Sequence, residues 1–230
     1  MNRTNVYIDG FNLFYGALKG SPYKWLDLEA LCRHLLPKDS INRIRYFTAR
    51  VSARPGDPQL PVRQETYLRA LATLPTVSIH LGVFYVSTTR AYLAHPPATG
   101  PKTAEVIKTE EKGSDVALAT YLMLDTCRGD CGTAVLITND SDLREPLRLA
   151  RDELNLTTGV INPHQASKRS RALQATFFKQ LRPSALAACQ LPLRSPMAGA
   201  GRSPSPATGN RRKRRSPRFP EGFALSHRSG

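Results

Sequence analysis

The stretch Ala134-Val135-Leu136-Ile137-Thr138-Asn139-Asp140-Ser141-Asp142 decides the fold class of this 230-residue chain. Its first four residues are all apolar, a run typical of a strand buried on both faces. A helix is predicted to follow from Leu143 to Leu154, and a further strand from Thr157 to Ile161. A buried strand, a helix and a second strand form the repeating unit of a parallel sheet.

The same alternation continues through the rest of the chain. Further strands are predicted at Val6–Ile8, Ile41–Val51, Val77–Val86 and Thr103–Lys108. Further helices are predicted at Asn12–Leu18, Leu28–Leu36, Val62–Leu74, Gly113–Leu124 and, last in the chain, Arg171–Leu181. Strands that alternate with helices predict an α/β fold, a three-layer sandwich in which helices cover both faces of a mostly parallel central sheet.

Positive charge is unevenly distributed along the chain. The chain has 33 Lys and Arg against 18 Asp and Glu, a net charge of +15. Residues 191–230 hold 9 of these basic residues and the single acid Glu221, with a basic run at Arg211–Arg215. Such a Pro-, Ser- and Arg-rich segment buries too little apolar surface to fold. We therefore expect a folded domain at 1–188, a disordered basic tail at 189–230, and an anionic partner.

Several classes of protein are excluded. No run approaches the roughly 18 apolar residues of a membrane span, and the N-terminus runs directly into a strand without a signal-like apolar region. The sequence contains no Gly-rich phosphate loop ending in Gly-Lys-Ser/Thr, and its histidines are scattered. We expect a cytoplasmic enzyme or binding protein with no membrane partner, and leave open whether it forms a homo-oligomer.

Acidic residues gather at one predicted edge of the sheet. Asp9 ends the first strand, Asp140 and Asp142 follow the strand at 134–137, and Asp115 lies in the first turn of a helix. Ligands of open α/β sheets bind at this carboxyl edge. Each acid also has a structural interpretation as a turn or helix-cap residue. Together they would repel one another unless a cation lies between them, which predicts a Mg²⁺ or Mn²⁺ site.

Three segments that contain these acids resemble the motifs of the NYN domain family, which is related to the PIN-like nucleases. The segments are Tyr7-Ile8-Asp9-Gly10-Phe11-Asn12, Lys112-Gly113-Ser114-Asp115-Val116-Ala117-Leu118-Ala119 and Thr138-Asn139-Asp140-Ser141-Asp142-Leu143. They occur in the order of the family, and the resemblance covers roughly residues 4–182. It implies a Rossmann-like, PIN-like sheet.

The resemblance also implies a metal-dependent ribonuclease. Its metal ligands would be Asp9, Asp115, Asp140 and Asp142, which together with Asn12 would form the catalytic set. Asn12 would orient Asp9 or a bound water. Many relatives carry a further acid six residues after the position of Asp115, where this chain has Tyr121, although Asp125 follows one turn later.

Basic residues beside the acidic segments are candidates for binding RNA, single-stranded or structured. The expected substrate-binding set is Lys102, Lys108, Lys112, Ser141 and Arg144. The main alternative is a non-catalytic RNA- or protein-binding module with the same fold. A phosphohydrolase of the haloacid-dehalogenase type would need an acid two residues after Asp9, where this chain has Phe11.

Overall fold

A computed structural model describes residues 3–53 and 56–192 of the chain. Its strands are β1 (Arg3–Asp9), β2 (Ser40–Ala49), β3 (Val77–Tyr92), β4 (Thr103–Lys112), β5 (Thr133–Ile137), β6 (Thr157–Asn162) and β7 (Phe177–Gln180). Its α-helices are α1 (Gly10–Leu13), α2 (Leu28–Leu35), α3 (Leu60–Leu71), α4 (Ser114–Cys127), α5 (Arg144–Asp152) and α6 (Pro183–Ala188). Short helical turns of other types are η1 (Phe14–Leu18), η2 (Ser141–Leu143) and η3 (Ala166–Lys168).

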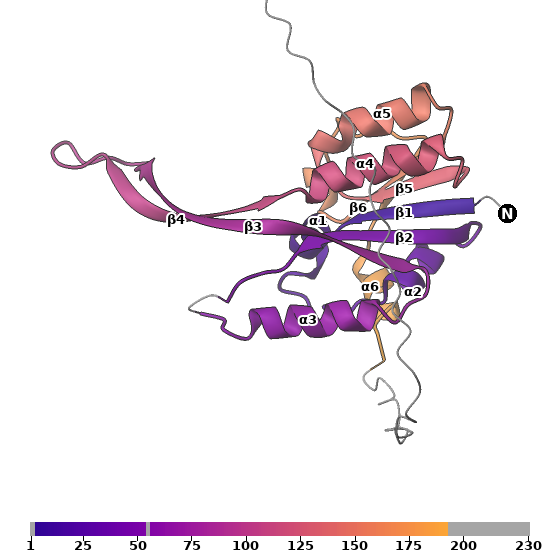
Figure 1. Ribbon diagram of the computed structural model, residues 1–230, viewed down its shortest axis with the longest axis horizontal. Coiled ribbons are helices and arrows are strands. Elements are labelled where there is room, and N and C mark those ends of the chain that lie inside the picture. The colour runs from indigo at the N-terminus through magenta and orange to yellow at the C-terminus, as the bar shows by residue number, and fades with distance from the viewer. Residues whose placement is uncertain (1–2, 54–55, 193–230) are drawn as a thin grey trace, which may run out of the picture. The chain divides into compact units, whose positions relative to one another are not determined.

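The described strands form one sheet of seven in the order β4-β3-β2-β1-β5-β6-β7. Neighbouring strands are parallel except for β3 and β4, which form an antiparallel hairpin. Helices α4 and α5 cover one face of the sheet, and α2, α3 and α6 cover the other (Figure 1). The predicted three-layer α/β sandwich with a mostly parallel sheet is confirmed.

Alternate residues of the central strands enter two separate cores. Val6 and Ile8 of β1 pack in the cluster formed with α2, α3 and α6. Tyr7, between them, packs with Leu118 and Leu122 of α4 on the opposite face. Because both faces of the sheet are covered, the central strands have continuous apolar runs rather than alternating ones.

The prediction of a helix at Arg171–Leu181 is wrong. Its second half is the strand β7, which pairs in parallel with β6. Leu173, Phe177 and Leu181 have the four-residue spacing that is typical of a helix face. The neighbouring side chains Phe177 and Phe178 instead lie on opposite faces of the sheet, in contact with different cores. The last helix, α6, begins at Pro183.

The β3–β4 hairpin is longer than predicted. Ten residue pairs join the two strands, from Val83 opposite Lys112 to Tyr92 opposite Thr103. At roughly 3.4 Å per residue, this ladder is about 30 Å long. Figure 1 shows the hairpin extending away from the layered body of the domain. One end of the hairpin therefore lies at the carboxyl edge of β1 and β2, and its tip lies far from that edge.

The folded unit continues past the expected boundary at residue 188. The backbone N–H of Asp27 donates to the carbonyl of Cys189, and the N–H of Leu191 donates to the carbonyl of Trp25. Residues 189–191 are therefore part of the domain. The basic tail predicted beyond them, including Arg211–Arg215, lies outside the described residues. Among the helices that the structure describes, none is both long and apolar enough to cross a bilayer.

Gly10, directly after β1, lies where no side chain fits. A Cβ atom at this position would lie 2.7 Å from the carbonyl oxygen of Phe47 and 2.8 Å from the ring of Tyr46. We therefore expect Gly10→Ala to lower the free energy of unfolding by about 1–3 kcal/mol, measured by urea denaturation. Gly56→Ala is the control, because a Cβ at Gly56 meets no atom within 4 Å. Equal stability of the two variants would contradict the close approach.

Candidate metal centre

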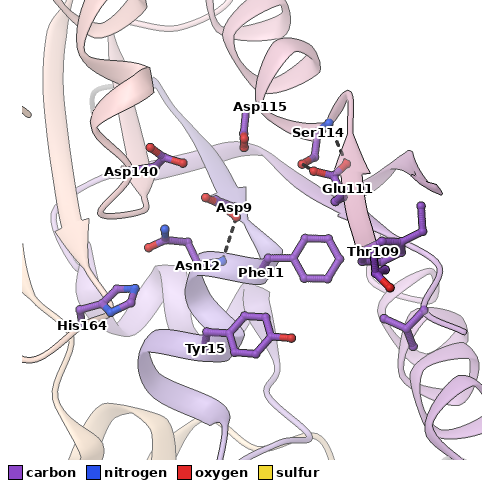
Figure 2. Close-up of a pocket in the computed structure, with 12 residues that line it drawn as sticks. Asp9, Phe11, Asn12, Tyr15, Thr109, Glu111, Ser114, Asp115, Asp140 and His164 are labelled. Atoms are coloured by element: carbon purple, nitrogen blue, oxygen red, sulfur yellow. Dashed lines mark hydrogen bonds between the residues drawn. The ribbon is translucent and has the colours of Figure 1, made fainter. Parts of the chain in front are cut away.

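Three aspartates from three separate elements meet at the carboxyl edge of the sheet. Asp9 ends β1, Asp140 follows the neighbouring strand β5, and Asp115 lies in the first turn of α4. One carboxylate oxygen from each lies within 4.8 Å of the other two. Figure 2 shows the three side chains converging on one space. Hereafter these three residues are called the acidic triad.

Asp9 is the buried member of the acidic triad, with 5% of its surface exposed. One carboxylate oxygen accepts from the backbone N–H of Asn12 at 2.9 Å, and the other accepts from the hydroxyl of Thr138 at 3.1 Å. The Thr138 oxygen in turn accepts from the N–H of Asp140 at 3.1 Å. Thr138 therefore joins the ends of β1 and β5 and fixes two members of the triad relative to each other.

Burial and mutual repulsion make the triad costly to ionise. Burial raises the pKa of Asp9, although its hydrogen bonds with Asn12 and Thr138 act in the opposite direction. Burial, followed by the nearby charges of Asp9 and Asp140, raises the pKa of Asp115 from 3.8 to about 6. A bound divalent cation would remove this repulsion, and three carboxylates suit a hard cation such as Mg²⁺ or Mn²⁺. The side chains present therefore fit the expected metal.

Asp115→Asn should stabilise the metal-free protein. Because the folded-state pKa of Asp115 lies above its unfolded value, the fold loses stability as the pH rises from 3.8 to about 6. At pH 7.5 in EDTA we expect the variant to gain about 1–2 kcal/mol, a value reduced for solvent screening of a partly exposed group. Urea unfolding measures this difference, and equal stabilities would contradict it. Adding Mn²⁺ should stabilise the wild type and leave the variant unchanged.

The other predicted catalytic residues lie beside the triad. The side-chain oxygen of Asn12 accepts from the N–H of Asn139 at 2.8 Å, so it ties the end of β1 to the loop after β5. Asn12 contacts Asp9 through its backbone N–H rather than its side chain. Asp142 is exposed, donates its N–H to Asp140 at 3.0 Å, and lies outside the group of three. Its role as a metal ligand stays a prediction.

A pocket of about 360 Å³ opens over the triad. Its twelve lining residues are Asp9, Phe11, Asn12, Tyr15, Val51, Phe84, Thr109, Glu111, Ser114, Asp115, Asp140 and His164 (Figure 2). None of these is Lys or Arg. The pocket is therefore acidic, and a negatively charged substrate needs positive charge from outside this lining.

A family model of the NYN domain matches residues 3–181. The chain belongs to the NYN domain family. This finding confirms the resemblance drawn from the three motifs, and it places the domain in a nuclease-like superfamily.

Two further proteins are similar to this NYN domain protein. It is 35% identical over 221 residues to the 6-hydroxy-3-succinoylpyridine 3-monooxygenase HspA of Pseudomonas putida, a match that covers 83% of this chain and 70% of that protein. It also resembles the crystal structure of a protein of unknown function, VPA0982, from Vibrio parahaemolyticus. That likeness has a TM-score of 0.52 and 12% identity, and covers 79% of this chain and 94% of the other. It shows a shared fold alone.

Tyr121, at the position where many NYN domains carry a further acid, packs against a buried ion pair. The ring of Tyr121 lies 4.3 Å from the guanidinium of Arg45. Arg45 binds both carboxylate oxygens of Asp125, at 2.7 and 2.8 Å, and the hydroxyl of Tyr7 donates to the same carboxylate at 3.0 Å. Asp125 is buried and fully engaged in this network, so it does not replace the missing acid at the metal centre.

The predicted substrate-binding residues are only partly near the pocket. Lys108 and Lys112 pair with Glu110, at 2.7 and 3.8 Å, on the exposed hairpin. Lys102 lies just past the far end of the β3–β4 ladder, about 30 Å along it from Lys112. Exposed Ser141 and Arg144 lie in η2 and at the start of α5, next to Asp140.

The pocket has an aromatic wall. Phe11 packs edge-on against Phe84 of β3, with ring centroids 5.4 Å apart. Tyr15, which is 49% exposed, lines the same pocket. Glu111, also in the lining, accepts from the N–H and hydroxyl of Ser114 at 3.1 and 2.6 Å and so caps α4. Phe84 lies in the hairpin and only the fold brings it to the triad, whereas Glu111 lies four residues before Asp115 in the sequence.

Proposed function

We propose that this protein is a metal-dependent endoribonuclease that hydrolyses RNA phosphodiester bonds. The observation that carries the proposal is the convergence of Asp9, Asp115 and Asp140 at the carboxyl edge of a parallel sheet. Membership of a family in a nuclease-like superfamily supports it. A cluster of carboxylates in a pocket of an α/β fold, with the pKa values of Asp9 and Asp115 raised, is typical of an active site.

The acidic triad would hold Mg²⁺ or Mn²⁺, with Asp142 as a further candidate ligand. The bound cation supplies the acidity that turns water into a nucleophile, and it stabilises charge on the phosphate. Asp9, fixed by Asn12 and Thr138, keeps one ligand at a constant position. In the overall reaction, the oxygen of water bonds to phosphorus, one P–O ester bond breaks, and the leaving oxygen becomes a hydroxyl after it gains a proton.

The aromatic wall of the pocket favours an unpaired RNA strand. Phe11, Phe84 and Tyr15 present ring surfaces next to the triad. Stacking of a base on an aromatic side chain contributes about 1–3 kcal/mol per base and tolerates any base. Bases of a duplex are already stacked on each other, so this wall suits single-stranded substrates.

A second candidate is oxygenation of a small heteroaromatic ring. The 35% identity to a 6-hydroxy-3-succinoylpyridine 3-monooxygenase favours it. The aromatic wall that suits a nucleobase also suits a substituted pyridine. A monooxygenase requires O₂ and two electrons from a reductant, whereas the nuclease requires only a divalent cation and water.

The different co-reactants allow a direct test. The purified full chain is incubated with Mn²⁺ and a 5′-labelled 20-mer of uridine under nitrogen, and separately with 6-hydroxy-3-succinoylpyridine, NADH and air. The proposal predicts RNA cleavage under nitrogen that EDTA abolishes. Oxygen consumption with the pyridine, without RNA cleavage, would select the second candidate. Tight RNA binding without turnover in either Mn²⁺ or Mg²⁺ would indicate a non-catalytic binding module.

A further inference from the structure

The loop from His164 to Arg171, which follows β6, lies at the same edge of the sheet as the acidic triad. We call it the basic loop. β1, β5 and β6 are parallel neighbours, so the segments after them emerge together. The acidic pocket includes His164, at the start of the loop. A neighbouring surface pocket of about 460 Å³ is lined by Ala166, Ser167, Arg169 and Arg171, nearer its end.

Hydrogen bonds fix the basic loop beside Asp140. The side-chain amide of Asn139 donates to the carbonyl of Lys168 at 2.8 Å, and its oxygen accepts from the N–H of Ser170 at 2.7 Å. The N–H of Asn139 is itself bound by the side chain of Asn12 at 2.8 Å. A continuous set of contacts therefore runs from the end of β1 through Asn139 to Lys168 and Ser170. The loop has a defined position relative to the triad.

The basic loop has positive charge that carboxylates do not neutralise. Lys168, Arg169 and Arg171 are all exposed. Within the described part of the chain, no carboxylate forms an ion pair with any of them. The sequence has no Asp or Glu between Glu153 and Glu221. By contrast, Lys108 and Lys112, which the sequence suggested as substrate-binding residues, are already paired with Glu110.

We propose that the basic loop binds backbone phosphates of the RNA next to the phosphate that is cleaved. This proposal rests on the proposed ribonuclease function and deepens it. An acidic pocket without Lys or Arg in its lining repels RNA, and the three cations of the basic loop offset that repulsion on one side. The strand then crosses the triad with phosphates on the basic loop and bases against the aromatic wall. Lys168, Arg169 and Arg171 are the residues that bind.

The test compares two charge-matched triple variants. One carries Lys168→Gln, Arg169→Gln and Arg171→Gln. The control carries Lys38→Gln, Arg69→Gln and Arg128→Gln, three exposed residues that precede β2, β3 and β5 and therefore lie at the opposite edge of the sheet. Because Arg169 stacks on Phe178 at 3.5 Å, a double variant of Lys168 and Arg171 alone repeats the test without disturbing that contact.

Binding of the 5′-labelled uridine 20-mer is measured in EDTA across a range of salt concentrations. Loss of three phosphate contacts should reduce the slope of log K against log salt by about 2, and weaken binding by about tenfold or more at 0.1 M salt. In Mn²⁺, the variant should cleave the 20-mer more slowly but cleave the dinucleotide UpU at the wild-type rate. The control should match the wild type throughout.

Wild-type binding and salt slope in both basic-loop variants would overturn the proposal, even if the enzyme cleaves RNA. A different outcome would overturn the proposed ribonuclease function but keep the basic loop as an RNA-binding site. In that outcome the wild type cleaves no RNA, and the basic-loop variants still bind RNA more weakly and with a smaller salt slope.

Discussion

Asp9→Asn should reduce Mn²⁺-dependent RNA cleavage by about 10³-fold or more, which corresponds to at least ~4 kcal/mol of lost transition-state stabilisation. The side chain is buried between the N–H of Asn12 and the hydroxyl of Thr138, and both donate to it. An amide there loses the negative charge that binds the cation. With the amide oxygen toward the N–H of Asn12, the NH₂ group faces the Thr138 hydroxyl, which then has to accept rather than donate. Initial rates of 20-mer cleavage at saturating Mn²⁺ measure the effect.

Two controls accompany this measurement. Asp152→Asn removes the same charge from an exposed ion pair with Arg151 at the end of α5, and should leave cleavage unchanged. The free energy of unfolding of Asp9→Asn should stay within about 1 kcal/mol of the wild type, because relief of the buried charge offsets the weakened hydrogen bonds in the metal-free fold. Cleavage by Asp9→Asn at the wild-type rate would remove Asp9 from the catalytic site.

Asp125→Leu should lower the free energy of unfolding by about 3–5 kcal/mol. The Arg45 and Asp125 side chains are only 8% and 1% exposed. Removal of the carboxylate leaves a buried guanidinium without its counter-charge and the Tyr7 hydroxyl without its acceptor. The pair also joins α4 to β2, and α4 carries Asp115. Urea denaturation measures the loss.

The double variant Arg45→Met, Asp125→Leu distinguishes a buried ion pair from simple packing. Replacing both charges by apolar groups removes the unpaired guanidinium, so the double variant should be more stable than Asp125→Leu alone. Asp130→Asn breaks the more exposed pair with Arg43 and should cost about 1 kcal/mol or less. A loss below about 1 kcal/mol in Asp125→Leu would contradict the proposed importance of the network.

Much of the fold could be predicted because its signals are local. The apolar runs at Val6–Ile8 and Ala134–Ile137 are buried on both faces, so their composition alone identifies them as central strands. Since parallel strands end at one edge, Asp9 and Asp140 were expected to meet there, and Asp115, in the first turn of α4, joins them. Asp142 was included because it shares the loop of Asp140, but its side chain is exposed.

The rest of the site depends on contacts between distant segments. Phe84 reaches the pocket because β3 continues beyond its partner β2 into the hairpin, and no local pattern marks that extension. The basic loop gains its position from the side chain of Asn139, which is one residue among several polar neighbours in the sequence. Spacing does not distinguish the β7 segment from a helix. Leu173, Phe177 and Leu181 are four residues apart, and side chains at this spacing lie on one face of a helix and also on one face of a strand.

The most direct test of the metal centre is a crystal structure of the full chain soaked in Mn²⁺, with anomalous scattering recorded. We expect an anomalous peak between the carboxylates of Asp9, Asp115 and Asp140, with Mn–O distances of about 2.0–2.3 Å, and no such peak in Asp9→Asn crystals. A peak bound by other residues, or an empty triad in protein that cleaves RNA under the same conditions, would contradict it.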